Sequence, residues 1–365
     1  MRAVVFRGAG IDLEVTDVDL APPGPGEVLV RIAAAGVCHS DLHVVRGEWT
    51  RTVPTVLGHE GSGTVVELGE GVVGLAPGDH VVLSWVAPCG ECRHCRAGAE
   101  ARCEVAANVV GPTGGLMDGT SRLSIGGEPA YHYLGVSSYA EYAVVPASGA
   151  IKVRDDAPLD LIALVGCAVA TGVGAVRNTA RVEPGSTVAV IGCGGVGLSI
   201  VQGARLAGAE RIVAIDLRRD KVELALTLGA THALVGSGDG LAGELRELAP
   251  HGVDYAFDAI GRTSTTEQAI GMLGLGGTAV VVGIPPEGSS ASFDPLVLVE
   301  NDQRILGSNY GGIRPSVDIP QLVDLVMSGD LLLEPMVSAR RPLDEAAAAL
   351  DDLADGHALR QLLIP

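Results

Sequence analysis

Short apolar runs separated by Gly and Pro fill the first third of the 365-residue chain. Residues 27–32 alternate between apolar and other positions, and residues 80–85 form another run rich in apolar side chains. Both patterns are typical of β-strands, and the turn residues between them keep such strands short. This part of the chain is therefore predicted to form a small β-barrel or β-sandwich.

From about residue 183 the pattern changes to strand, Gly-rich turn and helix. The predicted strands are residues 186–191, 211–215, 255–259 and 278–282, and the predicted helices are residues 199–207, 220–228 and 265–273. Strands that alternate with helices at this spacing form a parallel sheet with right-handed crossovers, as in a doubly wound nucleotide-binding domain. The fold class is therefore predicted to be α/β.

The C-terminal part of the chain does not continue this series. Residues 321–327 and 344–353 are predicted helices and residues 361–364 a strand, and we expect this tail to pack back on the first domain. Two domains also agree with the length of 365 residues, since single hydrophobic cores rarely grow to that size.

Composition narrows the class of protein further. Hydrophobic residues make up 47% of the chain and charged residues 19%, with 51 glycines, which fits a packed α/β protein rather than a disordered or fibrous one. With 25 Lys and Arg against 44 Asp and Glu, the net charge of −19 repels nucleic acid and anionic lipid surfaces. The apolar run before Arg7 is too short for a secretory signal, and the apolar segment 161–176 is too short to span a bilayer. We expect a cytoplasmic protein without nucleic-acid or membrane partners.

Four of the seven cysteines lie close together in the sequence. Cys89, Cys92, Cys95 and Cys103 form the pattern C-x2-C-x2-C-x7-C, which supplies enough soft ligands to surround one tetrahedral zinc ion. A closed site of this kind leaves no position for a substrate, so the metal would be structural. Reduced or disulfide-linked cysteines and an iron–sulfur cluster are the alternatives.

A glycine-rich turn follows the predicted strand 186–191 and opens an apolar helix. The pattern G-x-G-x-x-G is formed by Gly192, Gly194 and Gly197. Such glycines permit a tight turn and the approach of a pyrophosphate to the helix N-terminus. Asp216 ends the next predicted strand, about 20 residues after the motif, where an acid binds a ribose diol. This predicts NAD rather than NADP, although the nearby Arg218 and Arg219 could attract a 2′-phosphate.

Three further residues, Cys38, His59 and Cys167, lie in separate segments. Taken singly, a Cys or His among apolar residues is most often an ordinary core side chain. Together, two thiolates and one imidazole would hold a zinc ion with a fourth position open to water or to a substrate oxygen, as catalytic zinc requires. Spacing alone does not group them.

Several strings link the chain to a known family: GVCHSDLHVVRG, VLGHEGSGTVVELGEGV, the four-cysteine segment, MDGTSRL, IGCGGVGLS and HALRQLL. In this order they resemble the zinc-dependent medium-chain alcohol dehydrogenase family, and the resemblance spans nearly the whole chain. It is closest to the long-loop branch, which contains the animal alcohol dehydrogenases and the thiol-dependent formaldehyde dehydrogenases. The resemblance implies a GroES-like β-barrel catalytic domain in residues 1–168 and 310–365, with a zinc lobe near residues 89–103. It also implies a doubly wound, parallel-sheet Rossmann domain that binds NAD in residues 169–309.

Carried over position by position, the resemblance assigns the three separate residues above as ligands of a catalytic zinc. Asp41 and Glu60 match carboxylates near the metal, which would orient the imidazole and tune the charge of the site. Ser40 matches a hydroxyl relay and His43 a surface-side base, so a proton would pass from the alcohol through Ser40 and the cofactor ribose to His43 and water. A turn or helix cap and an exposed helix side chain are the alternatives for Ser40 and His43.

The resemblance also assigns residues to the cofactor and to the substrate. The cofactor-binding positions are His39, Thr171, Gly192, Gly194, Gly195, Val196, Gly197, Asp216, Lys221 and Arg360. His39 stands where many relatives have Arg, so we expect a weaker pyrophosphate clamp, and Arg360 matches another phosphate contact. The substrate cleft is assigned to Trp49, Trp85 and Asn309, with core packing as the alternative for both tryptophans.

The implied function is hydride transfer between NAD and an alcohol, or its aldehyde or ketone, in an enzyme with two Zn²⁺ ions per chain. The partners implied are a small-molecule alcohol or aldehyde and a second copy in a homodimer, with a homotetramer as the alternative. Three other functions stay open: a dehydrogenase of thiol–formaldehyde adducts, a pathway-specific biosynthetic dehydrogenase, and a non-catalytic dinucleotide-binding protein. The first is weakened because residues 104–111 lack the Arg that holds the thiol's carboxylate in that branch.

Overall fold

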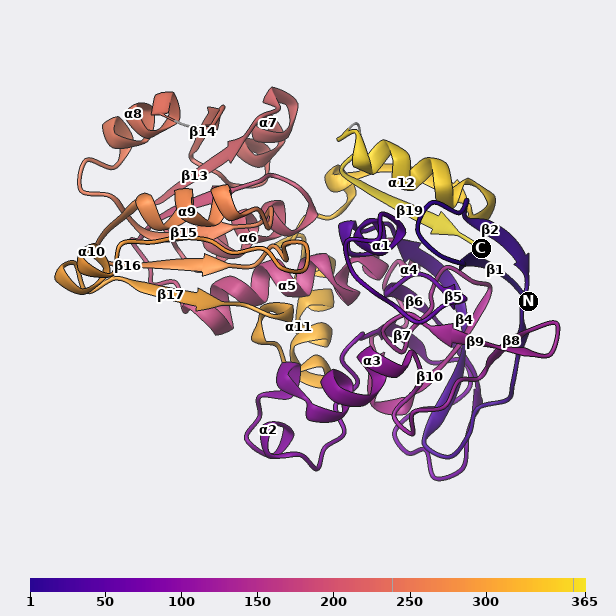
Figure 1. Cartoon of the computed structure of the whole chain (residues 1–365). Helices are drawn as coiled ribbons and strands as arrows, with labels where there is room; N and C mark the ends of the chain where they lie inside the picture. The colour runs from indigo at the N-terminus through magenta and orange to yellow at the C-terminus, as the bar shows by residue number, and fades with distance from the viewer. Residues whose placement is uncertain (238, 357) are drawn as a thin grey trace. The chain divides into compact units, whose positions relative to one another are not determined.

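The chain divides into two compact units (Figure 1). The structure is a computed structural model that describes residues 1–237, 239–356 and 358–365. Unit 1 comprises Met1–Cys167 and Arg314–Pro365, and unit 2 comprises Ala168–Ile313. Residues 168 and 310–313, which we assigned to the catalytic domain, therefore belong to the other unit.

Close backbone packing explains why the segment around residue 311 belongs to unit 2. The short 3-10 helix η6 (Tyr310–Gly312) lies against α5 (Ala168–Gly174). A Cβ at Gly311 would lie 2.6 Å from the carbonyl oxygen of Ala170, so only glycine permits this approach. The residue also has φ +63°, a conformation that L side chains rarely adopt.

Unit 1 is built on two β-sheets. The first has the order β2-β1-β5-β9-β8-β3, with β1 (Arg2–Phe6), β2 (Glu14–Asp17), β3 (Asp19–Leu20), β5 (Thr55–Val56), β8 (Leu123–Ile125) and β9 (Glu128–His132). The second has the order β11-β7-β6-β4-β19-β18, and β10 also pairs with β4. Its strands are β4 (Glu27–Gly36), β6 (Glu60–Leu68), β7 (His80–Leu83), β10 (Tyr142–Pro146), β11 (Ala150–Lys152), β18 (Val337–Pro342) and β19 (Arg360–Ile364). The runs predicted at 27–32 and 80–85 are thus both strands of the second sheet.

Short helices connect these strands. They are α1 (His39–Val45), α2 (Arg93–Arg96), α3 (Gly111–Thr113), α4 (Leu159–Ile162), α11 (Pro315–Ser328) and α12 (Ala346–Ala354), with 3-10 or π turns η1 (Glu100–Arg102), η2 (Ala106–Val110), η3 (Ala147–Gly149), η4 (Ala163–Gly166), η7 (Glu334–Met336) and η8 (Leu343–Glu345). The C-terminal tail returns to the start of the chain: β19 pairs with β4 through Leu362 and Gly36, and α12 packs on α1. The expected return of the tail to the first domain is confirmed (Figure 1).

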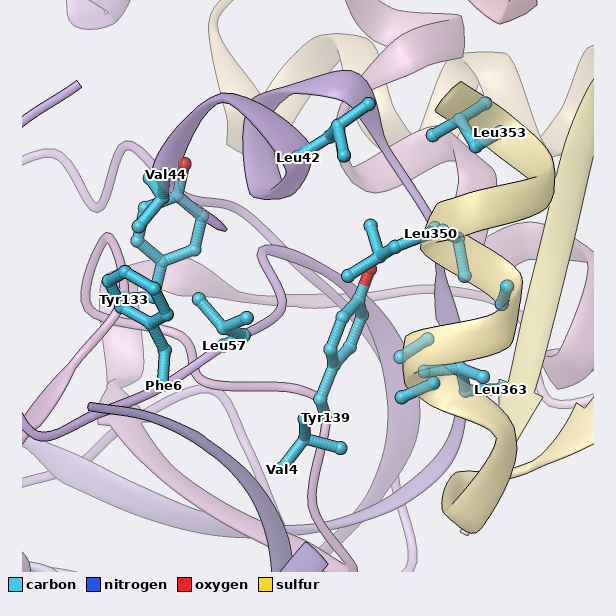
Figure 2. Close-up of a cluster of buried hydrophobic side chains, with 14 of the residues drawn as sticks. Val4, Phe6, Leu42, Val44, Leu57, Tyr133, Tyr139, Leu350, Leu353 and Leu363 are labelled. Atoms are coloured by element: carbon cyan, nitrogen blue, oxygen red, sulfur yellow. The ribbon is translucent and has the colours of Figure 1, made fainter. Parts of the chain in front are cut away.

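One hydrophobic cluster of unit 1 lies under α1 and α12 (Figure 2). Its members come from both ends of the chain and include Val4, Phe6, Leu42, Val44, Leu57, Tyr133, Tyr139, Leu350, Leu353 and Leu363. Burying one such aliphatic side chain contributes about 1.5–3 kcal/mol. A helix as short as α1 is marginal on its own, so these contacts hold it in place.

Unit 2 contains a parallel sheet with the order β14-β13-β12-β15-β16-β17. The strands are β12 (Thr187–Ile191), β13 (Arg211–Asp216), β14 (His232–Val235), β15 (Val253–Asp258), β16 (Leu273–Val281) and β17 (Arg304–Gly307). The helical segments besides α5 and η6 are η5 (Ala175–Ala180), α6 (Gly195–Leu206), α7 (Arg219–Thr227), α8 (Asp239–Leu248), α9 (Thr263–Gly271) and α10 (Pro295–Glu300). Helices pack on the strands and leave the central strands almost fully buried, as in doubly wound proteins. The predicted α/β fold is confirmed, although the sequence patterns did not identify β14, β17, α8 or α10.

The longest apolar segment lies in the protein interior. Residues 162–176 are all buried within α4, η4, α5 and η5. In the described part of the chain, no single helix combines the length and the apolar character needed to cross a membrane. Leu159–Gly166 and Ala168–Ala180 meet the criterion only as a bent pair, by length and composition.

Candidate functional site

The three expected ligands of a catalytic zinc come together in unit 1. Cys38 caps the N-terminus of α1, His59 immediately precedes β6, and Cys167 follows η4. One ligand atom from each of them and a carboxylate oxygen of Glu60 all lie within 4.8 Å of one another. The cluster is largely excluded from water, since Cys38 is 7% exposed and His59 1%. Two thiols and an imidazole in this arrangement fit the donor set of a zinc ion.

The imidazole of His59 is oriented by Asp41. Its Nδ1 lies 3.3 Å from Oδ1 and 3.2 Å from Oδ2 of that carboxylate, while Nε2 is buried without a hydrogen-bond partner among the described residues. Burial lowers the pKa of His59, but the charges of Asp41 and Cys38 outweigh burial and raise it well above its usual value. Nε2 of His59 therefore lies where a positive charge is favoured. A metal ion bound to Nε2 would give this buried nitrogen the partner that it lacks among the described residues.

Two further residues hold Asp41 in place. The backbone N–H of Gly58 donates to Oδ1 at 3.1 Å, and the hydroxyl of Tyr139 donates to Oδ2 at 3.2 Å. Burial raises the pKa of Tyr139 well above its usual value, so the hydroxyl stays a neutral donor. Gly58 has φ +91°, and a Cβ there would lie 2.4 Å from the Tyr139 ring. Sequence analysis did not find these two residues, since only the fold brings Tyr139 to α1.

The interaction of Cys38 with Cys167 shifts the pKa values of the two thiols in opposite directions. The contact with Cys167 is the largest cause that holds the pKa of Cys38 well below its usual range; burial opposes it and His59 supports it. The same contact, together with burial, raises the pKa of Cys167 well above its usual range. A divalent cation would favour the thiolate form of both residues, because thiolates are the form that binds metal.

Arg360 lies beside the same cluster. Its Nη2 forms an ion pair with Oε2 of Glu60, and the two side chains are only 3% and 0% exposed. A Cβ at Gly36 would lie 2.0 Å from Oε2 of Glu60, so glycine at that position makes room for the pair. Burial lowers the pKa of Arg360, but the negative charges of Glu60, Cys38 and Cys167 raise it above its usual value. The assignment of Arg360 to a cofactor phosphate stays a prediction.

The other four expected zinc ligands form a second cluster. The thiols of Cys89, Cys92, Cys95 and Cys103 are all free and lie within 4.8 Å of one another. Backbone N–H groups donate to the sulfurs, from Cys92 to Cys89 at 3.3 Å and from Cys95 to Cys92 at 3.4 Å. Backbone donors at Glu104 and Cys95 lower the pKa of Cys92 to about 6, whereas burial raises that of Cys95 to about 12. The structure contains no disulfide at these cysteines, and the cluster fits a closed four-thiolate zinc site.

The two expected relay residues lie one turn apart on α1. Ser40 and His43 are both half-buried, and the carbonyl oxygen of Ser40 accepts a hydrogen bond of 2.8 Å from the hydroxyl of Tyr133. The Tyr133 ring packs edge-on against His59, with the ring centroids 5.5 Å apart. Tyr133 therefore connects the relay helix to the metal cluster.

The residues assigned to the substrate occupy different surroundings. Trp49 is buried and stacks on His43, with ring centroids 4.5 Å apart. Trp85 follows β7 and is half-buried against the hydrophobic cluster of the second sheet. Asn309 precedes η6 in unit 2 and is exposed, and His39 is the exposed first residue of α1.

The glycine motif of unit 2 has the expected strand–turn–helix setting. Gly192 begins the turn after β12 with φ +93°, and a Cβ at Gly197 would lie 1.7 Å from the carbonyl oxygen of Gly192. In contrast, a Cβ at Gly194 would meet nothing within 4 Å. Gly194 also caps α6 without a side-chain hydrogen bond, and Gly195 and Val196 begin the helix. This open helix N-terminus fits a pyrophosphate.

Asp216 lies at the end of β13 beside this turn. Its Oδ2 accepts a 2.8 Å hydrogen bond from the N–H of Cys193, and its Oδ1 accepts a 3.0 Å bond from the N–H of Arg218. The guanidinium of Arg218 is paired with Asp220 at 2.9 Å. Lys221 lies in α7, half-buried, where its charge opposes the rise of the Cys193 pKa that burial causes.

A cavity of about 630 Å³ adjoins Asp216. It is lined by residues that include Ile191, Ile215, Asp216, Leu217, Gly236, Ile260, Arg262 and Met272. Its apolar side chains and the carboxylate of Asp216 suit an adenosine group. Ile260 and Arg262 were missed in the sequence because they follow β15, far from the glycine motif. Thr171 is buried in α5 of the same unit.

Comparison with known proteins identifies the family. Residues 24–155 match the alcohol dehydrogenase GroES-like domain, and residues 195–328 match the zinc-binding dehydrogenase domain. The S-(hydroxymethyl)glutathione dehydrogenase of Escherichia coli O1:K1 is 41% identical over 368 residues, which cover 99% of each chain. The chain belongs to the zinc-dependent alcohol dehydrogenases.

Two solved structures of this zinc-dependent alcohol dehydrogenase family are similar over the whole chain. An alcohol dehydrogenase zinc-binding domain protein from Burkholderia ambifaria has a TM-score of 0.95 and 39% identity, and the match covers 100% of this chain and 98% of that one. The benzyl alcohol dehydrogenase of Acinetobacter calcoaceticus has a TM-score of 0.94 and 34% identity, with the same coverage.

Family membership confirms the predicted oxidoreductase with NAD and two zinc ions as cofactors. The alternative of a non-catalytic dinucleotide-binding protein finds no support. When bound, one zinc ion would be held by Cys38, His59 and Cys167 and the other by the four-cysteine cluster.

Cysteine substitutions should separate the two metal sites. We expect about two zinc ions per chain in the native dehydrogenase and about one in both Cys103→Ser and Cys167→Ser, because each change removes a ligand from a different cluster. Only Cys167→Ser should keep the structural ion. Metal content is measured by mass spectrometry of the purified chains. Cys193→Ala is the control, since this buried thiol lies in neither cluster, and two ions retained in Cys167→Ser would contradict the assignment.

Proposed function

We propose that this enzyme oxidises an apolar primary alcohol to its aldehyde, and catalyses the reverse reaction, at Cys38, His59 and Cys167. The observation that carries the proposal is the buried Nε2 of His59, which has no partner among the described residues and belongs to a cluster with two thiols. When bound, zinc supplies a Lewis acid that lowers the pKa of the alcohol, and NAD supplies the hydride acceptor.

The side chains around the cluster have separate roles in this proposal. Asp41 fixes the ring of His59 through Nδ1, which leaves Nε2 for the metal. The hydroxyl of Ser40 accepts the proton of the alcohol as it releases its own toward His43, and Nε2 of His43 passes a proton to solvent. Arg360 balances the charge of Glu60 beside the two thiolates, which limits the cost of burying them.

The proposed substrate class follows from the similarity to a benzyl alcohol dehydrogenase, which favours an apolar, aromatic alcohol. Tyr133 lies edge-on to His59 and Trp49 stacks on His43, but both rings are buried in the hydrophobic cluster of unit 1, where they support the ligand and the relay residue.

A thiol–formaldehyde adduct is the second candidate substrate. The identity of 41% to an S-(hydroxymethyl)glutathione dehydrogenase favours it. Against it, residues 104–111 contain no Arg or Lys to hold the carboxylate of a thiol. A single natural alcohol in a biosynthetic pathway remains compatible with the same site.

A substrate panel followed by NADH absorbance tests the proposal. We expect benzyl alcohol and other apolar primary alcohols to reduce NAD, and loss of this activity in Cys167→Ser. Addition of glutathione or mycothiol should not increase turnover of formaldehyde. Turnover of formaldehyde only in the presence of a thiol would replace the first candidate by the second, and no turnover of any alcohol or adduct would overturn both.

Preference for NAD should depend on Asp216. We propose that its carboxylate accepts hydrogen bonds from the ribose diol and repels a 2′-phosphate, so Asp216→Ala should raise the ratio of kcat/KM for NADP over NAD by about 10-fold or more. Steady-state kinetics with both cofactors measures the ratio. Glu223→Ala, which removes an exposed charge from the neighbouring α7, is the control and should leave it unchanged. If the ratio in Asp216→Ala is the same as in the native enzyme, Asp216 does not belong to the cofactor site.

A homodimer is the proposed assembly. Among the described residues, β17 is an edge strand of the unit 2 sheet, and the adjacent α10 exposes Leu296 (62%) and Val299 (76%). Exposed apolar side chains beside an open sheet edge favour a second copy as the occupant. The expected cytoplasmic location stays a prediction.

Light scattering should therefore give about twice the mass of one 37.1 kDa chain. Val299→Arg should shift the population toward monomer, because it places a charge in the proposed interface. Val73→Arg, at a valine of unit 1 that is 87% exposed, is the matched control. A dimer that persists unchanged in Val299→Arg would refute this interface, and a fourfold mass would indicate the homotetramer.

A further inference from the structure

His43 has a carboxylate partner that the relay itself does not require. Its Nδ1 contacts Oε2 of Glu48, and the two side chains are 20% and 31% exposed. Within residues 1–237, 239–356 and 358–365, the structure records no other ion pair for Glu48 and no hydrogen bond to Nε2 of His43. Nδ1 of His43 is thus occupied, and Nε2 can exchange a proton.

The end of α1 builds this contact locally. Arg46 caps the helix, and Gly47 follows with φ +71°, the left-handed conformation that commonly ends helices. The N–H groups of Glu48 and Trp49 then both donate to the carbonyl oxygen of His43, at 2.9 and 3.4 Å. The chain reverses at this point, which brings the next two side chains back onto the imidazole.

The reversed segment encloses the ring on two sides. The carboxylate of Glu48 contacts Nδ1, whereas Trp49 stacks on the ring with an interplanar angle of 23°. Arg51 lies farther out, with its Cζ 5.8 Å from the Trp49 ring, and Arg46 is exposed. Glu48 is therefore the charged group in direct contact with the imidazole.

We propose that Glu48 is a positioning residue for His43. An ionised carboxylate accepts a hydrogen bond from Nδ1–H, which fixes the tautomer whose lone pair is on Nε2. When Nε2 takes up a proton, Glu48 stabilises the resulting imidazolium, and the same proton then leaves to water while Glu48 stays ionised. This inference rests on the proposed role of His43 in the relay. The arrangement repeats the physical logic by which a carboxylate orients a catalytic histidine.

A purely structural role is the alternative explanation. In that case Glu48 would only tie the segment after α1 to the helix, and its loss would lower stability or weaken substrate binding without changing proton transfer. The two explanations differ in three measurable properties: the tautomer of His43, the split between kcat and KM, and the solvent isotope effect.

The test compares Glu48→Leu, which removes the acceptor, with Glu48→Gln, which keeps an acceptor oxygen but removes the charge. We expect kcat for alcohol oxidation to fall about 10-fold in Glu48→Leu and less in Glu48→Gln, with KM unchanged within about twofold. The solvent isotope effect on kcat should increase, because proton transfer becomes slower than the other steps. In ¹⁵N spectra of the histidine-labelled enzyme, His43 should change from the Nδ1–H form to a mixture of tautomers in Glu48→Leu. Its signals are assigned by their absence in His43→Ala.

A second glutamate provides a matched control for the loss of a carboxylate. Glu67→Leu makes the same substitution at an exposed position of β6 and should retain native kinetics and spectra. An unchanged His43 tautomer in Glu48→Leu, or a fall in activity with no change in the isotope effect, would overturn the positioning role. If His43→Ala retains full turnover, the relay fails as part of the proposed function, whereas the ¹⁵N spectra still decide whether Glu48 sets the tautomer.

Discussion

The contact between Asp41 and His59 governs the chemistry of unit 1. A partner on one ring nitrogen orients a histidine so that the other can bind a metal, and here the carboxylate contacts Nδ1 and leaves Nε2 buried without a partner among the described residues. Asp41 is itself fixed by the N–H of Gly58 and the hydroxyl of Tyr139. The orientation of a single ring is therefore determined by three segments of the chain and by the hydrophobic cluster in which Tyr139 and α1 are packed.

Charge balance is the second constraint on this site. Cys38, Cys167, Asp41 and Glu60 place several acidic groups within a few ångströms in the buried interior. Unpaired buried charges cost several kcal/mol each, so such a cluster is stable only with compensating cations. Arg360 supplies one, through its ion pair with Glu60, and a divalent metal would supply the other. The raised pKa of Cys167, which the contact with Cys38, burial and the charges of Cys38 and Glu60 cause, reflects the same need for positive charge.

In unit 2 the constraint is steric. Gly192 and Gly197 allow the turn after β12 to pass against the first turn of α6, whereas the space at Gly194 stays open. Asp216 then reaches the same turn from β13, because neighbouring parallel strands end at the same edge of the sheet. The proposed cofactor site is thus formed largely by backbone geometry, and Asp216 is the carboxylate proposed to select NAD.

Those parts of this protein that depend on short-range order could be predicted from the amino-acid sequence. Neighbouring residues define the four-cysteine lobe and the glycine motif with its flanking strand and helix. They also define the change from a strand-rich pattern to alternating strands and helices. These features could therefore be predicted from the sequence. The contacts between residues that are distant in the sequence depend on how the strands and helices pack. Cys38, His59 and Cys167 became a cluster through the pairing of β4 with β6 and the packing of η4. Arg360 reached Glu60 because β19 returns to β4, and Tyr139 reached Asp41 through the hydrophobic cluster. The contact of Glu48 with His43 needed the exact turn at Gly47, which residue spacing does not encode, since side chains five positions apart on a continuing helix would not meet.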